Sequence, residues 1–188
     1  MGKKKFDKKD KIIREIGLPV DVSASVNDSL LEIKGQKGAV KLPLKQKNIS
    51  VKVHSNKIII ESHSGAKKSK KLIGSLMAHI KNMIKGSTQN HIYILKICSG
   101  HFPMNVSISN NKIVIKNFLG EKFPRVLQLK EGADVKVEGD LIYVESANKE
   151  IAGQQSADIE QLMRRPGYDT RVFQDGIYII NKDGRELK

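Results

Sequence analysis

Residues 31–38 read LEIKGQKG and residues 113–120 read IVIKNFLG, so the second stretch repeats the apolar, isoleucine-lysine and closing glycine positions of the first. The similarity continues downstream in the same order. The matched positions are Val51, Lys52, Val53, Glu61, Ser62, Leu72, Ile73, Gly74, Ile80 and Met83 in the first copy, and Val135, Lys136, Val137, Glu145, Ser146, Ile151, Ala152, Gly153, Ile159 and Leu162 in the second. A repeat of about 80 residues is long enough to fold by itself, unlike a solenoid unit. The chain is therefore predicted to contain two similar domains.

Each copy begins with a strand pattern and ends with a helix pattern. Apolar residues first alternate with polar ones between turn-forming residues, which predicts short antiparallel strands in a meander. Apolar residues then recur at spacings of three and four, which predicts one helix per copy. These helices are expected from about Ala66 to Lys85, with Gly86 as the stop, and from about Asn148 to Met163. The predicted fold class is α+β, with two tandem similar domains, each an antiparallel sheet packed against one main helix.

The predicted boundaries give a basic N-terminal arm (1–16), a first domain (17–88), a second domain (89–182) and a tail (183–188). The arm is rich in lysine and has few apolar anchors, so it is expected to stay mobile until an acidic partner orders it. After the second helix, a closing hairpin is expected, with strands at Val172-Phe173 and Ile177 to Ile180 around a turn at Asp175-Gly176.

The positive charge of the chain is concentrated in its first half. The net charge is +14; residues 1–90 hold 20 Lys or Arg against 7 acidic residues, whereas residues 91–188 hold 14 against 13. Between Lys34 and Lys71 there are eleven lysines and one acidic residue, Glu61. Such a density repels itself unless a polyanion neutralises it. Lysine also solubilises ordinary surfaces, but an excess of this size in one region favours nucleic acid as the partner.

Other functional classes find little support in the sequence. The single cysteine, Cys98, cannot form an internal disulfide and fits a reducing compartment. No apolar stretch approaches the about 20 residues of a membrane span, and the five histidines are scattered. The common nucleotide-binding, hydrolase and metalloprotease motifs are missing. We therefore expect a soluble intracellular protein that is not an enzyme, with no cofactor, no metal, no small-molecule substrate and no membrane partner.

Two further patterns bear on how RNA would be bound. The segment Lys34 to Gly38 contains the Gly-x-x-Gly of KH-type RNA clamps, but strand-like flanks predict a hairpin that carries two lysines. The chain has four Tyr, five Phe and no Trp, so we expect no clustered rings for stacking single-stranded bases. Phe173 and Tyr178 are expected to pack inside the protein. A folded RNA recognised through phosphates and shape is the predicted target.

Four strings resemble one ribosomal protein family. They are NMIKG (82–86), HFPMNV (101–106), NFLGEK (117–122) and RVFQDGIY (171–178). With the duplicated plan, they resemble protein six of the large ribosomal subunit in its archaeal and eukaryotic branch, over about residues 16–182. The resemblance implies a cytoplasmic, structural component of the large subunit, bound to large-subunit rRNA near the sarcin-ricin loop and the factor-binding region. It also implies neighbouring ribosomal proteins as partners, no independent homo-oligomer and no catalytic residue.

The candidate rRNA-binding residues form two groups. Charge alone selects Lys34, Lys37, Lys67, Lys68, Lys70 and Lys71 in the first copy. The last four crowd a helix start, where free N–H groups and the helix dipole attract phosphate. The family resemblance selects Lys116, Lys122, Arg125, Arg164, Arg165 and Arg171 in the second copy, with Gly120, Asp175 and Gly176 shaping the turns that present them.

Two alternatives of other classes stay open. The first is a regulatory RNA- or DNA-binding protein that acts outside the ribosome. The second is a protein-protein adaptor that uses the acidic second domain, whose helix carries Glu150, Asp158 and Glu160 where the first helix carries lysines.

Overall fold

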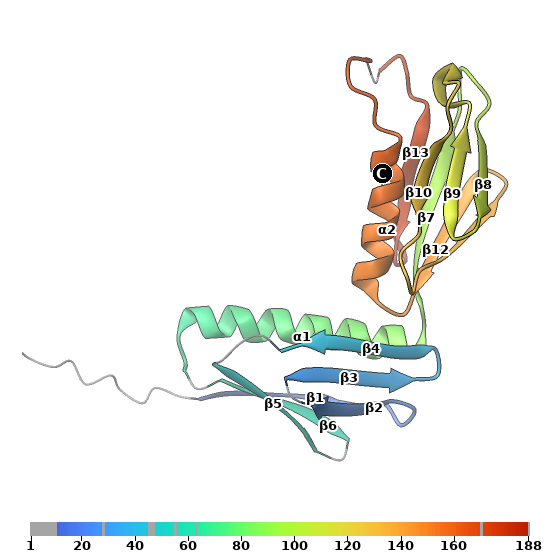
Figure 1. The fold of residues 1–188 in the computed structure, drawn as a ribbon. Coiled ribbons are helices and arrows are strands. Elements are labelled where there is room, and N and C mark those ends of the chain that lie inside the picture. Colours follow the sequence, from blue (N-terminus) through green and yellow to red (C-terminus); the bar gives the residue numbers. More distant parts are fainter. Residues whose placement is uncertain are drawn as a thin grey trace, which may run out of the picture. The chain divides into compact units, whose positions relative to one another are not determined.

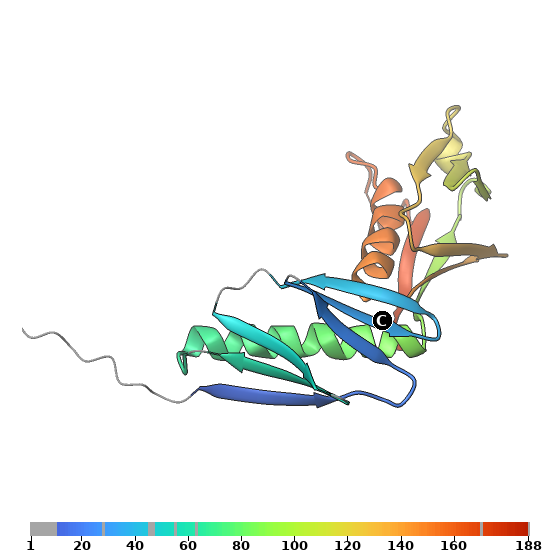
Figure 2. The same ribbon diagram turned by 60° about the horizontal axis from the view of Figure 1, so that its bottom comes forward.

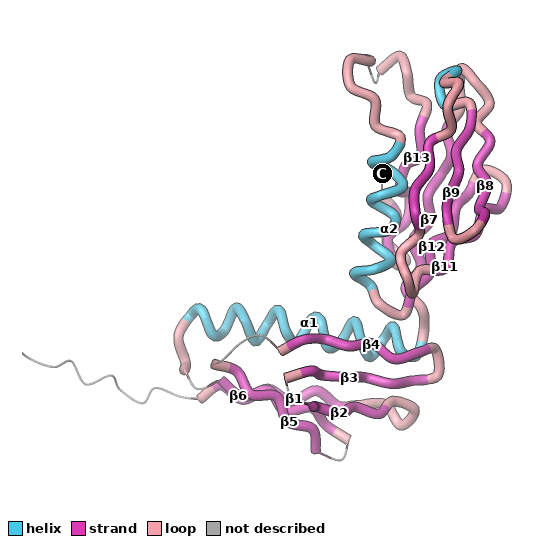
Figure 3. The backbone as a smooth tube through the Cα atoms, viewed as in Figure 1, coloured by secondary structure: helices cyan, strands magenta, loops and turns pink. Residues whose placement is uncertain are grey.

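The computed structural model describes residues 11–27, 29–44, 48–54, 56–62, 64–169 and 171–187. The chain divides into two compact units, residues 1–89 and 90–188. Within each unit, one long helix packs against antiparallel strands (Figures 1 and 3). The predicted α+β class with two similar domains is confirmed. The exact domain boundaries stay predictions.

The described strands of the first unit form two three-stranded antiparallel sheets, ordered β1-β6-β5 and β2-β3-β4. Their bounds are β1 (Ile12–Gly17), β2 (Ser23–Asn27), β3 (Leu30–Gly35), β4 (Gly38–Pro43), β5 (Ile49–His54) and β6 (Lys57–Ser62). The predicted meander is interrupted between β4 and β5, which lie in different sheets. Strand β1, which the pattern did not predict, pairs with β6. Strand β6 carries the fully buried Ile58 and Ile60, and it is covered by a partner strand on each edge.

Strand β1 lies within the segment that was predicted to be a mobile arm. It pairs with β6 from Ile12↔Ser62 to Gly17↔Lys57, and Ile16 is buried. The structure therefore differs from the prediction for residues 12–16, because the stretch pairs with β6 along its whole length and buries Ile16 despite the lysine-rich context. The predicted arm before Lys11 lies outside the described residues.

Helix α1 (Lys67–Thr88) extends beyond its predicted stop, and Gly86 is buried within it. The end of the helix contacts the β3–β4 hairpin, where the Lys37 amide donates to the Ser87 carbonyl oxygen at 3.0 Å. A Cβ atom on Gly35 would lie 2.5 Å from that same oxygen, so only glycine permits this approach. The buried row of α1 faces the sheets and forms the core of the unit; it consists of Ile73, Leu76, Ile80 and Met83.

The second unit has a five-stranded sheet, ordered β11-β12-β7-β13-β14, and a three-stranded sheet, ordered β10-β9-β8. The bounds are β7 (His91–Cys98), β8 (Asn105–Ser109), β9 (Lys112–Lys116), β10 (Arg125–Gln128), β11 (Asp134–Glu138), β12 (Leu141–Ser146), β13 (Gly176–Lys182) and β14 (Arg185–Glu186). Helix α2 (Lys149–Leu162) is capped by Asn148, whose side chain accepts the Glu150 amide at 2.9 Å. A short 3-10 helix, η1 (Phe118–Gly120), follows β9.

The predicted closing hairpin of the second unit is wrong. Strand β13 pairs with β7 along one edge and with β14 along the other, and the tight turn is at Asp183-Gly184. Val172 and Phe173 lie in a loop, where Phe173 packs against His101 and Tyr168 instead of pairing as a strand. Residues 185–186, predicted as part of a tail, complete the sheet.

Candidate nucleic-acid interface

Four candidate lysines stand on the first turns of α1: Lys67, Lys68, Lys70 and Lys71. All four are exposed. The cap residue Ala66 offers no side-chain hydrogen bond, and no acidic residue lies in the first turn. The first N–H groups of a helix have no partner within the helix, and the dipole is positive there. The lysines and this helix end therefore present positive potential together, and none of the four belongs to the preceding loop.

Lys34 and Lys37 stand at the opposite end of the same helix. Both are exposed on the β3–β4 hairpin, which touches α1 at Ser87. Lys34 lies 3.6 Å from Glu32, an exposed ion pair of small energetic weight. At a rise of about 1.5 Å per residue, Lys68 and Ser87 are about 28 Å apart along the axis. The structure thus does not gather the six lysines into one patch.

Arg125 is bound inside the second unit. Its guanidinium donates to both carboxylate oxygens of Glu121, at 2.8 and 2.7 Å, and to the carbonyl oxygen of Leu162. It also lies 4.4 Å from the centre of the Phe118 ring. The hydrogen bond from Arg125 holds the pKa of Glu121 below its usual value. Arg125, with a side chain only 19% exposed, joins β10 to the end of α2.

The other candidate cations of the second unit differ in exposure. Lys116, Lys122 and Arg164 are exposed. Arg165 is half-buried, 3.6 Å from Glu121 and 4.3 Å from the centre of the Tyr168 ring. Since the Arg125 guanidinium lies 3.4 Å from the Arg164 carbonyl oxygen, the loops after β9 and α2 meet, and they bring Arg125, Arg164 and Arg165 together.

Arg171 stands further along the same loop and is 88% exposed. It donates to both oxygens of Asp169, at 3.1 and 2.8 Å, and this hydrogen bonding holds the pKa of Asp169 below its ordinary value. Because the pair is open to water, Asp169 neutralises much of the charge without fixing the arginine firmly.

Three rings of the second unit lie in contact, although no sequence pattern grouped them. The expectation that the chain has no ring platform for stacking single-stranded bases stays a prediction. The centres of the His101 and Phe173 rings are 5.1 Å apart, and those of Phe173 and Tyr168 are 5.0 Å apart, edge to face. The Arg165 guanidinium lies over the Tyr168 ring. The residues come from two loops more than sixty positions apart, so no local spacing could have indicated the cluster. The half-buried Phe173 packs as predicted, whereas Tyr178 is 41% exposed, so the prediction that it packs inside the protein is wrong.

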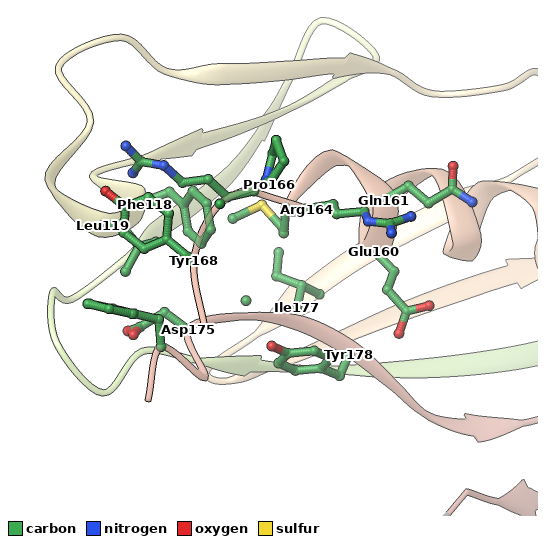
Figure 4. A pocket seen from close by; sticks show the side chains of 15 residues that line it. Phe118, Leu119, Glu160, Gln161, Arg164, Pro166, Tyr168, Asp175, Ile177 and Tyr178 are labelled. Carbon is green, nitrogen blue, oxygen red and sulfur yellow. The ribbon is translucent and has the colours of Figure 1, made fainter. Parts of the chain in front are cut away.

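Next to this cluster is a cavity of about 520 Å³ between the end of α2 and β13. In Figure 4, Tyr168 and Asp175 lie toward one end of it and Glu160 and Gln161 toward the other. Arg164 and Arg165 also line it. The cavity thus combines cationic, aromatic and hydrogen-bonding groups, the set that an unstacked base and its phosphate would require.

The turn residues shape the loops around the cluster. Gly120 has φ of +74°, a left-handed conformation that favours glycine. The Asp175 carboxylate accepts the His101 amide at 3.0 Å and contacts the His101 ring. Burial raises the pKa of Asp175, but hydrogen bonds from His101 and Gly100 outweigh it, so the pKa lies below the ordinary carboxyl value. Gly176 follows directly and begins β13.

Within the described ranges, neither helix is long and apolar enough to cross a membrane. The same part of the chain has no group of three or more His, Cys, Asp or Glu side chains placed to hold a metal ion.

These features place the chain among duplicated α+β proteins with strongly basic surfaces. The family model for Ribosomal protein L6 matches it over residues 18–90 and again over 102–176. The large ribosomal subunit protein uL6 of Methanococcus vannielii is 42% identical over 176 residues, which cover 94% of this chain and 97% of that protein. The uL6 proteins of Methanobrevibacter smithii and Methanothrix thermoacetophila are 39% and 36% identical, each over 92% of this chain and 97% and 98% of their own lengths.

The chain belongs to the ribosomal protein L6 family. The resemblance seen in the sequence strings is confirmed by this membership. The family is one of structural ribosomal proteins, in agreement with the prediction that the chain is not an enzyme.

Proposed function

We propose that the chain is a structural component of the large ribosomal subunit that binds and stabilises folded large-subunit rRNA near the sarcin-ricin loop and the factor-binding region. The observation that carries this proposal is membership of the L6 family over nearly the whole chain. The exposed lysines at the start of α1 support it, because they meet the requirement of a phosphate-binding surface.

Three surfaces contribute to RNA binding. Lys67, Lys68, Lys70 and Lys71 bind phosphates at one end of α1, and Lys34 and Lys37 do so at the other. In the second unit, Lys116, Lys122, Arg164, Arg165 and Arg171 contact the RNA around the aromatic cluster. Arg125 acts indirectly, because its bonds to Glu121 and Leu162 hold the loops that present the other cations.

The proposal includes the setting of the protein. Its partners are large-subunit rRNA and neighbouring proteins of the large subunit, in the cytoplasm. The chain acts as one copy in the particle and not as an independent homo-oligomer.

The acidic face of α2 gives little support to the adaptor alternative. Asp158 pairs with Lys130 at 2.7 Å and accepts the Gln154 amide group at 2.7 Å. Glu160 accepts the Ile179 amide at 3.1 Å. Both carboxylates are thus engaged in contacts within the unit. A regulatory RNA- or DNA-binding protein shares the basic surfaces, so cell fractionation has to separate it from a ribosomal one.

The deciding experiment combines sedimentation with binding in a salt series. The tagged full-length chain is expected to comigrate with large subunits at physiological salt. Its affinity for an rRNA fragment that carries the sarcin-ricin stem is expected to fall with a log-log slope of about −4 or steeper, as for six or more phosphate contacts. Absence from the large-subunit fractions would refute the ribosomal role, and a flat salt dependence would refute phosphate binding.

A further inference from the structure

The two units differ at one edge of their main sheets. In the second unit, β13 pairs antiparallel with β7, from Gly176↔Cys98 to Lys182↔Tyr93. The first unit has a strand in the place of β7, namely β1, because Ile12↔Ser62 corresponds to His91↔Ser146 in the repeat. Among the described residues, β1 is an edge strand, and Figure 2 shows it at the border of its sheet.

The helix-facing side of β1 is correspondingly open. In β7, this row consists of His91, Tyr93 and Leu95, all buried. In β1 the matching row is Ile12, Arg14 and Ile16, of which only Ile16 is buried and Arg14 is exposed. An uncovered row beside an unpaired strand edge is a template for another strand.

Gly74 of α1 and Gly153 of α2, which occupy matching positions in the repeat, differ in the same way in what surrounds them. A Cβ atom on Gly153 of α2 would lie 3.4 Å from the Tyr93 hydroxyl oxygen. A Cβ atom on the matching Gly74 of α1 would meet no atom of the described residues within 4 Å. No described residue of the first unit therefore fills the space that Tyr93 fills in the second.

This space is a groove of about 890 Å³ between β1 and α1. Its floor is apolar, with Ile12, Ile73 and Met77, and Lys11, Arg14 and Lys70 also line it. The described lining residues include no carboxylate. A ligand that fits has alternating donors and acceptors for the strand edge, apolar side chains for the floor and negative charge for Lys11 and Arg14. Lys70, at the rim, belongs to the phosphate-binding group at the start of α1.

We propose that this groove binds an extended, acidic polypeptide segment of another large-subunit protein, which adds to β1 as β13 adds to β7. The inference rests on the proposed function for the source of the segment. By analogy with Ile177 and Ile179, two apolar side chains spaced by two face α1. The bound segment carries an acidic side chain opposite Arg14. In the second unit, the equivalent position is Lys182, which stands opposite Tyr93.

A polypeptide suits this groove better than the other occupants. A strand edge alternates N–H and C=O groups, which a peptide main chain matches, whereas phosphate oxygens only accept hydrogen bonds. A second copy of β1 would bring Lys11 and Arg14 against their own equivalents, and like charges repel.

The test uses two synthetic fluorescent peptides and the full-length chain. One peptide has the sequence of residues 175–182, DGIYIINK, and the other ends in Glu, DGIYIINE. In fluorescence anisotropy, the Glu peptide is expected to bind at least about tenfold more tightly than the Lys peptide. Binding is also expected to protect amides of β1 from hydrogen exchange. Equal affinity of the two peptides, or no protection of β1, would overturn the proposal.

Variants distinguish the groove from other sites. Gly74→Leu fills the groove and is expected to lower the affinity for the Glu peptide at least about tenfold. The matched control Ser75→Leu, at an exposed position on another face of α1, should bind as the wild type does. Arg14→Glu should reverse the preference between the two peptides. Unchanged binding by Gly74→Leu would refute the site.

RNA binding by the same variants separates this inference from the proposed function. Gly74→Leu is expected to keep the affinity of the wild type for the rRNA fragment. If Gly74→Leu instead lowers the affinity for the rRNA fragment, the polypeptide proposal is overturned. Dimerisation of the wild type through β1 in sedimentation equilibrium would also overturn it. If the wild type binds the peptide but never the rRNA, the proposed function fails and the groove stands.

Discussion

A Cβ atom on Gly35 would lie 2.5 Å from the carbonyl oxygen of Ser87, so the β3–β4 hairpin and the last turn of α1 touch through their main chains. Gly35→Ala must separate them and is expected to lower the free energy of unfolding of the first unit by about 1–3 kcal/mol. Far-UV circular dichroism in a urea series measures this loss.

Gly74→Ala is the matched control for this substitution. The new Cβ atom meets no described atom within 4 Å, so Gly74→Ala should stabilise α1 by about 0.5–1 kcal/mol. All four tyrosines follow residue 90, so their fluorescence reports the second unit and should not change in either variant. An unshifted urea midpoint for Gly35→Ala would show that the hairpin contact is not formed.

Asp175 is expected to make the second unit sensitive to acid. Its pKa in the folded state lies below the ordinary value, so the ionised form adds stability above about pH 4 and loses it as the pH falls through the lower, folded-state pKa. Asp175→Asn should cost about 1–3 kcal/mol at neutral pH and flatten the loss of stability below about pH 4. Urea unfolding followed by tyrosine fluorescence across pH measures both effects. The exposed Asp134→Asn should keep the wild-type profile.

Arg125 and Lys122 should separate stability from RNA binding. Arg125→Lys keeps the charge but loses the two-point contact with Glu121 and the bond to Leu162, which should destabilise the second unit by about 1.5–3 kcal/mol. Lys122→Gln, at an exposed position, should change stability by less than about 0.5 kcal/mol and weaken rRNA binding. If Arg125→Lys weakened rRNA binding without loss of stability, and Lys122→Gln destabilised the unit, the assigned roles of the two residues would be wrong.

Replacing Lys67, Lys68, Lys70 and Lys71 by Gln should remove up to about 3 from the magnitude of the log-log salt slope of rRNA binding, with little change in stability. Gln at Lys34 and Lys37 should remove up to about 1.5 more, additively, because the two groups are far apart. Lys52 and Lys57 pair with Glu61 and Glu15, so their replacement is the control and should change the slope less. An unchanged slope in the fourfold variant would exclude phosphate binding at the start of α1.

The sequence predicted the elements of this fold better than their pairing. Residue periodicity and caps located α2 to within one residue at each end, because Asn148 and Met163 flank it. The pairing of β1 with β6 and of β13 with β7 depends on tertiary contacts, which local patterns do not contain.

The same limit applies to the candidate site. Exposed lysines were visible from composition, but the internal role of Arg125 depends on a carbonyl group 37 residues away in the sequence. Likewise, His101 joins Phe173 only because Asp175 holds the two loops together.

The length of α1 carries a consequence for selectivity. Lys34 and Lys37 are anchored at its last turn and the four-lysine group at its first, so a stiff rod fixes the gap between them at about 28 Å. A ligand that neutralises both ends must offer two phosphate clusters at that spacing. The first unit would then select RNA molecules by the spacing of their phosphate clusters, independent of nucleotide identity. A helix shortened by one turn would place the two lysine groups at the wrong spacing.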